Sequence, residues 1–252
     1  MTVHFVGAGP GAADLITIRA ERQLSECSVC LYAGSLVPPE VLAHCPPTAT
    51  LIDTADLNLD QITDAIAAAD AGGKDVVRLC SGDPAVFSAI AEQARRLDRL
   101  GIDYDITPGV PAFAAAAAAL RRELTVPEVG QTVILTRIAQ RASAMPPGEE
   151  LASLGAIRTT LVLHLAVQRI DQVVTDLEPH YGPDCPVAVV AHASRPGELI
   201  LRGTLGDIAA QVHAAGIRRT AVIIVGEVLA AEGFRDSHLY SAARERSSSS
   251  GI

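Results

Sequence analysis

The sequence lacks tryptophan, has almost no lysine and contains no long uncharged apolar run. Lys74 is the only lysine among the 20 basic residues. This scarcity argues against Schiff-base chemistry, and no Gly-Lys-Ser/Thr phosphate-binding motif is present. Asp, Arg or Gly interrupts every apolar stretch, so we expect no membrane span. Aromatic residues make up only 3% of a chain that is 49% hydrophobic, so the core must be built mainly from Ala, Val, Leu and Ile.

Cysteine and positive charge are also limited. The five cysteines show no disulfide-scaffold pattern, which fits a reducing cytoplasm. No basic segment followed by an apolar one precedes the first expected strand, so we expect no secretory signal. The formal net charge of −9 argues against nucleic acid as a partner, because phosphate binding needs clustered cations.

Short apolar runs alternate with helical patterns through residue 110, which predicts an α/β fold whose first sheet is mostly parallel. In the chain that follows, a turn at 194–197 between two apolar runs signals a hairpin, and therefore a mixed second sheet. The expected strands are 3–6, 29–32, 50–53, 75–79 and 104–107, then 132–136, 160–165, 187–191, 199–202 and 221–225. The main expected helices are 14–25, 58–69, 84–100, 111–122, 168–177 and 205–215.

Two domains are expected from this pattern. Pro127 and Gly130 mark a hinge at 123–130 between an N-terminal α/β domain, residues 1–122, and a C-terminal α/β domain, residues 131–240. The serine-rich end, 241–252, is expected to be disordered.

The residues after the fourth expected strand are the most informative stretch of the chain. Ser81 and Gly82 end an apolar run, and an amphipathic helical pattern follows. Asp83 is a favourable N-cap, Pro84 suits the first helical position, and Gly101 suits the helix end. The stretch predicts a strand-to-helix turn with free backbone N–H groups, at the carboxyl end of a strand where open α/β sheets bind ligands.

The loop Gly7-Ala8-Gly9-Pro10-Gly11 satisfies the loose dinucleotide-binding pattern. The acid expected about 20 residues later is missing, however, because the second strand ends in Leu31-Tyr32-Ala33-Gly34. Pro10 also lacks the N–H that such a loop needs. A close-packed loop shaped for another ligand is the better interpretation, and NAD stays as an alternative.

Other candidates have an ordinary structural interpretation beside the functional one. Cys27-x-x-Cys30 resembles a metal or redox pair, but no second pair follows at zinc spacing, so core packing explains it better and no metal is expected. His164 and His192 lie at the ends of expected strands. Each could act as a general base, or be an ordinary hydrogen-bonded, half-buried histidine. The arginines that could face a polycarboxylate or form surface ion pairs are Arg137, Arg169 and Arg195.

Several stretches together resemble the tetrapyrrole methyltransferase family, the class III S-adenosylmethionine enzymes of cobalamin and sirohaem synthesis. The stretches that carry the resemblance are residues 6–11 with Asp14-Leu15-Ile16-Thr17, residues 78–84, and Thr107-Pro108-Gly109-Val110 before an Ala-rich helix. Tyr32-Ala33-Gly34-Ser35-Leu36-Val37 resembles the signature of the precorrin-4 C-11 branch. The uroporphyrinogen III branch would carry an Asp-Arg pair in place of Ala33-Gly34, so no catalytic residue is carried over.

The resemblance implies two α/β domains with S-adenosylmethionine in the cleft between them, in a homodimer that binds a tetrapyrrole and releases S-adenosylhomocysteine. The cofactor-binding residues it implies are Pro10, Ser81, Gly82, Asp83, Val86, Pro111, Ala112, Leu165, Ala193 and Ala221. The chain departs from its relatives at Pro111-Ala112, where Ser or Thr is usual, and at Leu165, which is often Met. The candidate substrate-binding residues, which include arginines near strand ends, are Gly9, Gly11, Tyr32, Ser35, Arg78, Arg137 and Arg195.

The activity implied by the resemblance is methylation of precorrin-4 at C-11, giving precorrin-5 in cobalamin biosynthesis. Methyl transfer from a sulfonium to an electron-rich carbon needs alignment in a dry site but no protein nucleophile, which explains why no catalytic triad stands out. The alternatives are the cobalt-precorrin-4 reaction, methylation at another ring position of a precorrin or uroporphyrinogen, a non-catalytic tetrapyrrole carrier, and an NAD oxidoreductase. The sequence does not separate metal-free from cobalt-containing substrate.

Overall fold

The structure is a computed structural model, and it describes residues 2–139 and 144–237. Packing divides the chain into two compact units. The first comprises Met1–Ala119 and Ala191–Leu199, and the second comprises Leu120–Val190 and the chain from Ile200 onward. The domain boundaries expected from the sequence and the cleft between the domains stay predictions. The expected tail, 241–252, lies outside the described residues.

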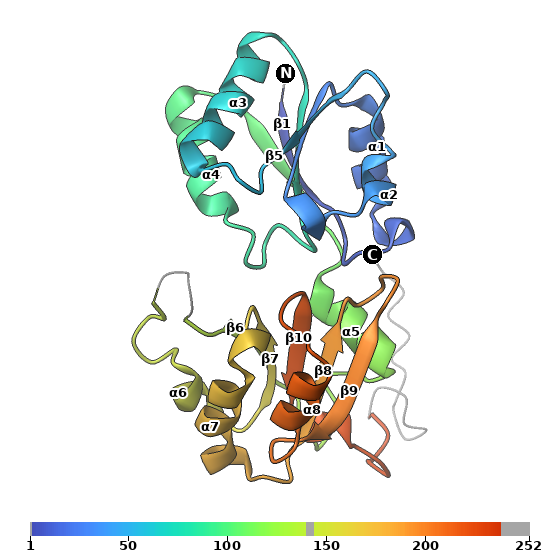
Figure 1. Cartoon of the computed structure of the whole chain (residues 1–252), viewed down its shortest axis with the longest axis vertical. Coiled ribbons are helices and arrows are strands. Elements are labelled where there is room, and N and C mark those ends of the chain that lie inside the picture. The colour runs from blue at the N-terminus through green and yellow to red at the C-terminus, as the bar shows by residue number, and fades with distance from the viewer. Residues whose placement is uncertain (1, 140–143, 238–252) are drawn as a thin grey trace, which may run out of the picture. The chain divides into compact units, whose positions relative to one another are not determined.

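A five-stranded, all-parallel sheet forms the centre of the first unit (Figure 1). Its strand order, β3-β2-β4-β1-β5, places β1 and β4 side by side. The strands are β1 (Val3–Gly7), β2 (Val29–Tyr32), β3 (Thr50–Asp53), β4 (Val76–Cys80) and β5 (Tyr104–Thr107). Because all these pairs are parallel, the carboxyl ends of the strands share one edge of the sheet, and the expectation of a parallel first sheet is confirmed.

Helices cover both faces of this sheet, as Figure 1 shows. The helices of the first unit are α1 (Ile18–Glu26), α2 (Pro39–Leu42), α3 (Leu59–Ala71), α4 (Ile90–Leu100) and the part of α5 (Ala112–Leu120) before Leu120. Short 3₁₀ helices lie at Ala13–Leu15 and Gly34–Leu36. Thr17 caps α1, and Asn58 forms a capping box with Gln61 at α3. Gly101 ends α4 with a φ of 68°, as its sequence position predicts.

The three central strands, β1, β2 and β4, are buried on both faces, so their side chains alternate between two apolar clusters. Val76 and Cys80 of β4 belong to the cluster beneath α3 and α4, together with Phe5. Val77 and Leu79 belong to the cluster beneath α1 and α2. This arrangement explains why β4 reads as a continuous apolar run interrupted only by Arg78.

The second unit contains a five-stranded mixed sheet with the order β6-β7-β10-β8-β9. Its strands are β6 (Val133–Arg137), β7 (Thr160–His164), β8 (Pro186–Ala191), β9 (Leu199–Thr204) and β10 (Ala221–Val225). The pair β6–β7 is parallel and the pair β7–β10 is antiparallel, which confirms the predicted mixed sheet. The helices are α6 (Leu151–Gly155), α7 (Ile170–Tyr181) and α8 (Ile208–Ala214), and 3₁₀ helices lie at Val167–Arg169 and Glu227–Leu229.

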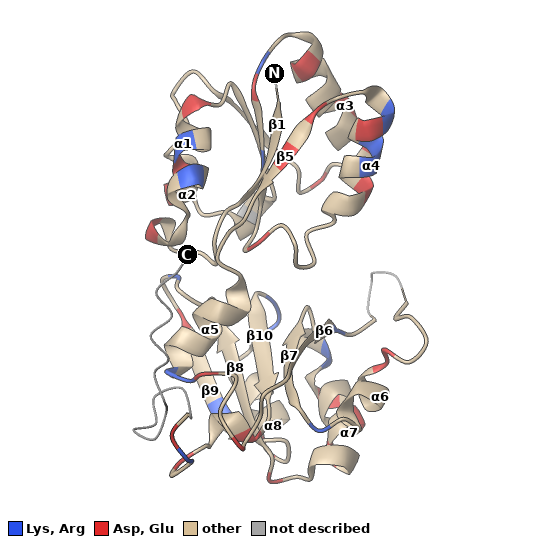
Figure 2. Cartoon of the chain, turned by 180° about the vertical axis from the view of Figure 1, so that it is seen from behind, with Lys and Arg blue, Asp and Glu red and all other residues tan. Residues whose placement is uncertain are grey.

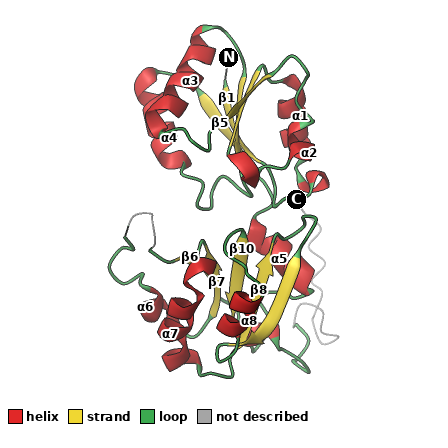
Figure 3. Cartoon of the chain, viewed as in Figure 1, coloured by secondary structure: helices red, strands yellow, loops and turns green. Residues whose placement is uncertain are grey.

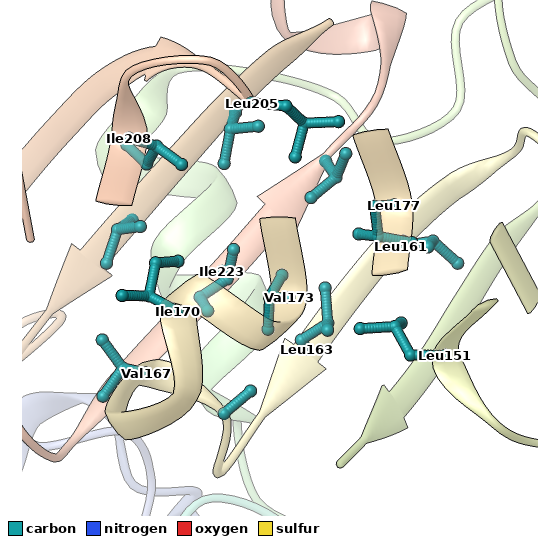
Figure 4. Packing of buried hydrophobic residues seen from close by; sticks show 14 of the residues in the cluster. Leu151, Leu161, Leu163, Val167, Ile170, Val173, Leu177, Leu205, Ile208 and Ile223 are labelled. Carbon is teal, nitrogen blue, oxygen red and sulfur yellow. The ribbon is translucent and has the colours of Figure 1, made fainter. Parts of the chain in front are cut away.

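One large apolar cluster holds the second unit together. Figure 4 shows Ile170 and Val173 of α7 lying against Leu163 of β7 and Ile223 of β10, and these side chains are all but fully buried.

Figure 3 colours helices and strands differently and shows the helices that flank the strands in each unit. Charged residues lie mostly on helices and loops (Figure 2). Among the described residues, no helix is both long and apolar enough to cross a membrane.

The helix expected from Pro84 begins later than predicted. Residues 84–87 form a turn, Phe87 and Ala89 adopt left-handed conformations with φ of 52° and 54°, and α4 starts at Ile90. The apolar spacing from Val86 onward has the helical period, but the Asp83 carboxylate binds the Ala85 N–H in this turn and the Gly109 N–H of the loop after β5. The assignment of Asp83 as the N-cap of this helix is therefore wrong.

Candidate ligand-binding site

Two loops at the carboxyl edge of the first sheet are joined backbone to backbone. Gly7 and Cys80 are paired at the ends of β1 and β4. Just beyond, the Gly9 N–H donates to the Gly82 carbonyl at 3.2 Å, and the Gly82 N–H donates to the Gly9 carbonyl at 2.8 Å. The Ala8 N–H donates to the Cys80 carbonyl at 2.8 Å. These bonds fix the glycine loop and the turn after β4 as one element.

The loop after β5 packs into the same place, and only glycines permit it. A Cβ atom on Gly109 would collide with the Gly82 carbonyl oxygen and lie 2.8 Å from the Gly7 Cα. A Cβ on Gly7 would lie 2.5 Å from the Gly109 Cα. Gly82 itself has a φ of 69°, in the left-handed region that favours glycine. Three strand ends therefore meet here with backbone against backbone.

Asp83 holds these loops in position. One carboxylate oxygen accepts the Gly109 N–H and the other accepts the Ala85 N–H, each at 2.8 Å. Charge-assisted bonds of this kind are stronger than neutral ones. The Asp83 carboxylate is thus engaged with the protein backbone, and it organises the turn in place of capping a helix.

A segment distant in sequence covers the glycine loop within the first unit. Arg195 lies over Gly11, so that a Cβ on Gly11 would collide with the Arg195 side chain. The Arg195 guanidinium donates to the carbonyls of Pro10 at 3.3 Å and Leu36 at 2.5 Å. The Ser194 hydroxyl accepts the N–H of Ala12 at 3.1 Å. Desolvation by burial lowers the pKa of Arg195.

Arg78 is buried, contrary to a role as an open cation of a substrate trough. It is 7% exposed, and desolvation lowers its pKa. Its Nε donates to the Gln93 side-chain oxygen at 3.1 Å, and its Nη1 donates to the Leu79 carbonyl at 3.2 Å. The Gln93 amide nitrogen donates in turn to the Ala89 carbonyl at 2.9 Å. Arg78 therefore links β4 to α4 and to the left-handed residue that precedes it.

A second group of predicted residues lies at one edge of the mixed sheet. Arg137 and His164 are opposite each other at the carboxyl ends of the parallel strands β6 and β7. Leu165 follows with a φ of 54° and a side chain that is 60% exposed. Because β10 runs antiparallel to β7, Ala221 at its beginning lies at the same edge. Desolvation lowers the pKa of His164.

The structure separates the predicted cofactor-binding residues between the two units. The first unit holds eight of them, Pro10, Ser81, Gly82, Asp83, Val86, Pro111, Ala112 and Ala193. The second unit holds Leu165 and Ala221. Pro10 and Ala193 are buried, whereas Ser81, Val86, Pro111 and Ala112 are partly exposed.

The predicted substrate-binding residues are also divided. Gly9 and Gly11 are buried in the first unit, and Tyr32 is partly exposed at the end of β2. Ser35 lies in the 3₁₀ helix Gly34–Leu36, and its side chain is outside the described part of the structure. Arg137 lies in the second unit, as does Arg169 at the end of a 3₁₀ helix.

Sequence reasoning assigned no role to several residues that build the edge. The most important is Gly109, although it lies in the quoted Thr107-Pro108-Gly109-Val110 stretch. Gln93 and Ser194 gave no signal, because their partners lie 15 and 182 residues away. Within the described residues, no group of three or more His, Cys, Asp or Glu side chains could hold a metal ion.

The first unit is an open α/β sheet, and such sheets bind their ligands at the carboxyl edge, where the interlocked small-residue turns of this chain lie. The family model of the tetrapyrrole (corrin/porphyrin) methylases matches residues 2–209. This chain belongs to that family.

Individual relatives agree with the family match. The chain is 62% identical over 246 residues to the precorrin-4 C(11)-methyltransferase of Rhodococcus erythropolis, covering 98% of this chain and 99% of the relative. The solved structure of a cobalamin biosynthetic enzyme, cobalt precorrin-4 methyltransferase, matches with a TM-score of 0.88 and 38% identity, covering 90% of this chain and 95% of that one. The predicted family and its precorrin-4 branch are confirmed.

A third match concerns the cofactor. The uroporphyrin-III C-methyl transferase from Thermus thermophilus, solved in complex with S-adenyl homocysteine, matches with a TM-score of 0.79 and 28% identity. The match covers 91% of this chain and 99% of that one. The fold of this chain is therefore shared with a protein that binds the demethylated form of the methyl donor.

Proposed function

We propose that this chain transfers a methyl group from S-adenosylmethionine to C-11 of precorrin-4, giving precorrin-5 in cobalamin biosynthesis. The observation that carries the proposal is the edge of the first sheet, where Asp83 and three glycines hold the turn after β4 against the loops after β1 and β5. The 62% identity to a precorrin-4 C(11)-methyltransferase supports the same substrate and ring position.

The residues at this edge fit S-adenosylmethionine. The position of a Cβ on Gly82 lies 3.6 Å from the Ala112 nitrogen and the Pro111 Cα, so the turn packs in van der Waals contact with the start of α5. Ala112 begins α5, and the first N–H groups of a helix have no acceptor within the helix and favour a carboxylate. The neighbouring Ser81 and Val86 supply a hydroxyl and an apolar surface. We assign Pro10, Ser81, Gly82, Asp83, Val86, Pro111, Ala112 and Ala193 to the cofactor, with Leu165 and Ala221 from the second unit.

When bound, the cofactor supplies an electrophilic methyl group on a sulfonium. The chain needs no nucleophile of its own, so its residues act by positioning and by excluding water. Alignment of reacting atoms contributes about 7–11 kcal/mol in well-oriented systems. The rigid pairing of Gly9 with Gly82, and the Asp83 bonds that fix Gly109, provide a platform that does not have to reorganise on binding.

The substrate carries several carboxylates, and the proposed contacts are cationic or backbone groups. Arg137 and Arg195 are the candidate cations, with Gly9, Gly11, Tyr32 and Ser35 along the loops. Arg195 already donates to two backbone carbonyls, so it positions the glycine loop as well. Arg78, being buried, serves the site by supporting α4 and the turn before it.

The same proposal includes the biological setting. We propose a homodimer in the cytoplasm that releases S-adenosylhomocysteine. The free state of all five cysteines is consistent with a reducing compartment.

The proposal is tested by incubating the protein with precorrin-4 and S-adenosylmethionine labelled with ¹³C in the methyl group. We expect a product heavier by one labelled methyl, with the label bonded to C-11 in its NMR spectrum. A label at another ring carbon would assign the chain to a different methylase of the family. Methyl transfer to neither precorrin-4 nor a related tetrapyrrole would contradict the proposed activity.

The cobalt form of the substrate is the second candidate. It is favoured by one observation, the TM-score of 0.88 to a cobalt precorrin-4 methyltransferase. The assay is therefore run in parallel with precorrin-4 and cobalt-precorrin-4 at matched concentrations. The larger kcat/KM identifies the preferred substrate.

A further inference from the structure

Three thiols lie together in the first unit, away from the glycine edge. Cys27 ends α1, Cys30 lies in β2, and Cys45 follows α2. The sulfurs of Cys27 and Cys45 are 3.9 Å apart, and the buried Cys30 thiol is coupled electrostatically to both. All three are free thiols, and only Cys45 is partly exposed. The proposed methyl transfer uses none of them.

We propose that Cys27 and Cys45 form a reversible disulfide when the protein meets a peroxide. A disulfide bond is about 2.05 Å long, so the two sulfurs must approach by roughly 1.9 Å. Cys45 is placed to make that movement because it lies in a turn after the four-residue helix α2, rather than in a strand of the sheet. Cys30 lies within β2 and is fixed by its neighbours on both sides.

The three thiols differ in reactivity, and the difference favours attack by Cys45. The hydrogen bond that Cys27 donates lowers the pKa of Cys45, and the neighbouring Cys30 and His44 act in the same direction. Interaction with the neighbouring Cys27 and Cys45, together with burial, raises the pKa of Cys30. Because the thiolate is the nucleophile, the most accessible thiol of the cluster is also the one that ionises most readily.

The reaction balances with a peroxide as the oxidant. The Cys45 thiolate attacks one oxygen of hydrogen peroxide, forming an S–O bond and breaking the O–O bond, and the departing hydroxide takes a proton to become water. The Cys27 thiol then attacks the Cys45 sulfur. The S–S bond forms, the S–O bond breaks, and the leaving hydroxide takes the Cys27 proton as a second water. Two thiols are oxidised by two electrons, and the peroxide is reduced to two waters.

The other two cysteines of the chain lack such a partner among the described residues. Cys80 donates to the Arg78 carbonyl, and Cys185 donates to the Pro186 carbonyl. Burial raises the pKa of both thiols, to about 11 for Cys80 and about 12 for Cys185. They serve as internal references for thiols that peroxide should leave intact.

A disulfide between Cys27 and Cys45 would join the end of α1 to the chain after α2. The enclosed segment contains β2 and the 3₁₀ helix Gly34–Leu36, whose Leu36 carbonyl accepts from Arg195. Oxidation should therefore slow backbone hydrogen exchange in residues 33–44. This effect follows from the fold alone, whichever substrate the chain uses.

The test treats the reduced full-length protein with hydrogen peroxide, alkylates the remaining thiols and maps the peptides by mass spectrometry. Trypsin is unsuitable because no Lys or Arg lies between Arg22 and Lys74, so all three cysteines would stay in one peptide. Cleavage after Glu26 and Glu40 instead separates Cys27 and Cys30 from Cys45. We expect the two peptides to be linked, with fragmentation placing the bond at Cys27, and to separate again with dithiothreitol.

Variants decide between this pair and other oxidation products. We expect Cys45→Ser to abolish the link and to slow thiol loss about tenfold, since the most reactive thiolate is gone. The matched control Cys185→Ser, a buried thiol of the second unit, should keep the link and the rate. The proposal is overturned by the absence of a linked peptide in the unaltered protein, by over-oxidation of Cys45 alone, or by a Cys30–Cys45 link that persists in Cys27→Ser.

Discussion

The two sheets end in edges of different character. At the edge of the first, the loops after β1, β4 and β5 bond to one another through glycine backbones and the Asp83 carboxylate. At the edge of the second, Leu165 holds a left-handed conformation and exposes most of a large apolar side chain. The first edge is rigid because Gly9 and Gly82 are hydrogen-bonded to each other and Gly109 is hydrogen-bonded to Asp83. The second presents a strained, exposed side chain, which is a common feature of ligand-binding positions.

This difference suggests a division of work between the units. A rigid backbone platform suits a cofactor that must be held in one orientation. Side chains such as Arg137 and Leu165 can adapt or be exchanged without disturbing a fold whose core lies elsewhere. Substitutions should therefore affect stability and binding together at the first edge, and binding alone at the second.

The largest effect is expected from Gly109→Ala. The added methyl group collides with the Gly82 carbonyl, so we expect the free energy of unfolding to fall by about 1–3 kcal/mol. S-Adenosylmethionine binding, measured by calorimetry, should be lost. The control Gly72→Ala has a φ of −84° and no contact closer than 3.4 Å, and it should change stability by less than about 0.5 kcal/mol. Equal effects of the two substitutions would contradict the interlocked edge.

Arg78→Met tests the buried hydrogen bond between Arg78 of β4 and Gln93 of α4. The substitution leaves the Gln93 side-chain oxygen without its donor, and we expect unfolding to become easier by about 1–3 kcal/mol in denaturant titrations. Adding Gln93→Leu removes the side-chain amide that Arg78→Met leaves without its donor. The double variant should therefore be more stable than the sum of the two single changes predicts. Simple additivity would mean that the two side chains do not act together. A guanidinium that binds substrate directly would instead raise KM with little loss of stability.

Asp83→Asn should have a moderate effect on both properties. One of the two N–H acceptors is lost and the charge is removed, so we expect destabilisation of about 1.5 kcal/mol. A comparable loss in binding energy would raise the Kd for S-adenosylmethionine about tenfold. The exposed acid Asp64 on α3 provides the matched substitution Asp64→Asn, which should alter neither quantity. An unchanged Kd in Asp83→Asn would remove Asp83 from the proposed site.

The smallest effect on stability is expected at the second edge. Leu165→Gly relieves a left-handed conformation but adds freedom to the unfolded chain, so the net change should stay within about 1 kcal/mol. Binding of S-adenosylmethionine should still weaken, because the proposed apolar contact with the cofactor is removed. Ile157, also 60% exposed in the second unit, supplies the control Ile157→Ala, which should leave binding unchanged. A large loss of stability in Leu165→Gly would contradict the contrast between the two edges.

The strands of this fold could be predicted because their signal is local. The runs 29–32, 50–53, 104–107 and 221–225 match β2, β3, β5 and β10 residue for residue. Apolar runs between turn residues are sufficient for that. The short helices α2 and α6 were not predicted, because four or five residues carry no periodic apolar stripe.

The site could be predicted only where residue type reveals the role. Gly82 was found because a small residue ends an apolar run there, and its φ of 69° shows why glycine is needed. The actual role of Asp83 depends on Gly109, 26 residues away, and the position of Arg195 depends on Pro10, 185 residues away. Arg78 was expected to line the substrate trough because it lies near a strand end, but its strand is buried on both faces. These contacts between distant residues are set by tertiary packing.

The most direct test of the account is calorimetric titration of the protein with S-adenosylmethionine and, separately, with NAD. We predict binding of one S-adenosylmethionine per chain and no heat from NAD. The affinity should fall in Asp83→Asn and stay unchanged in Asp64→Asn. Binding of NAD, or an S-adenosylmethionine affinity that is the same in all three proteins, would contradict the claim that the edge of the first sheet holds the methyl donor.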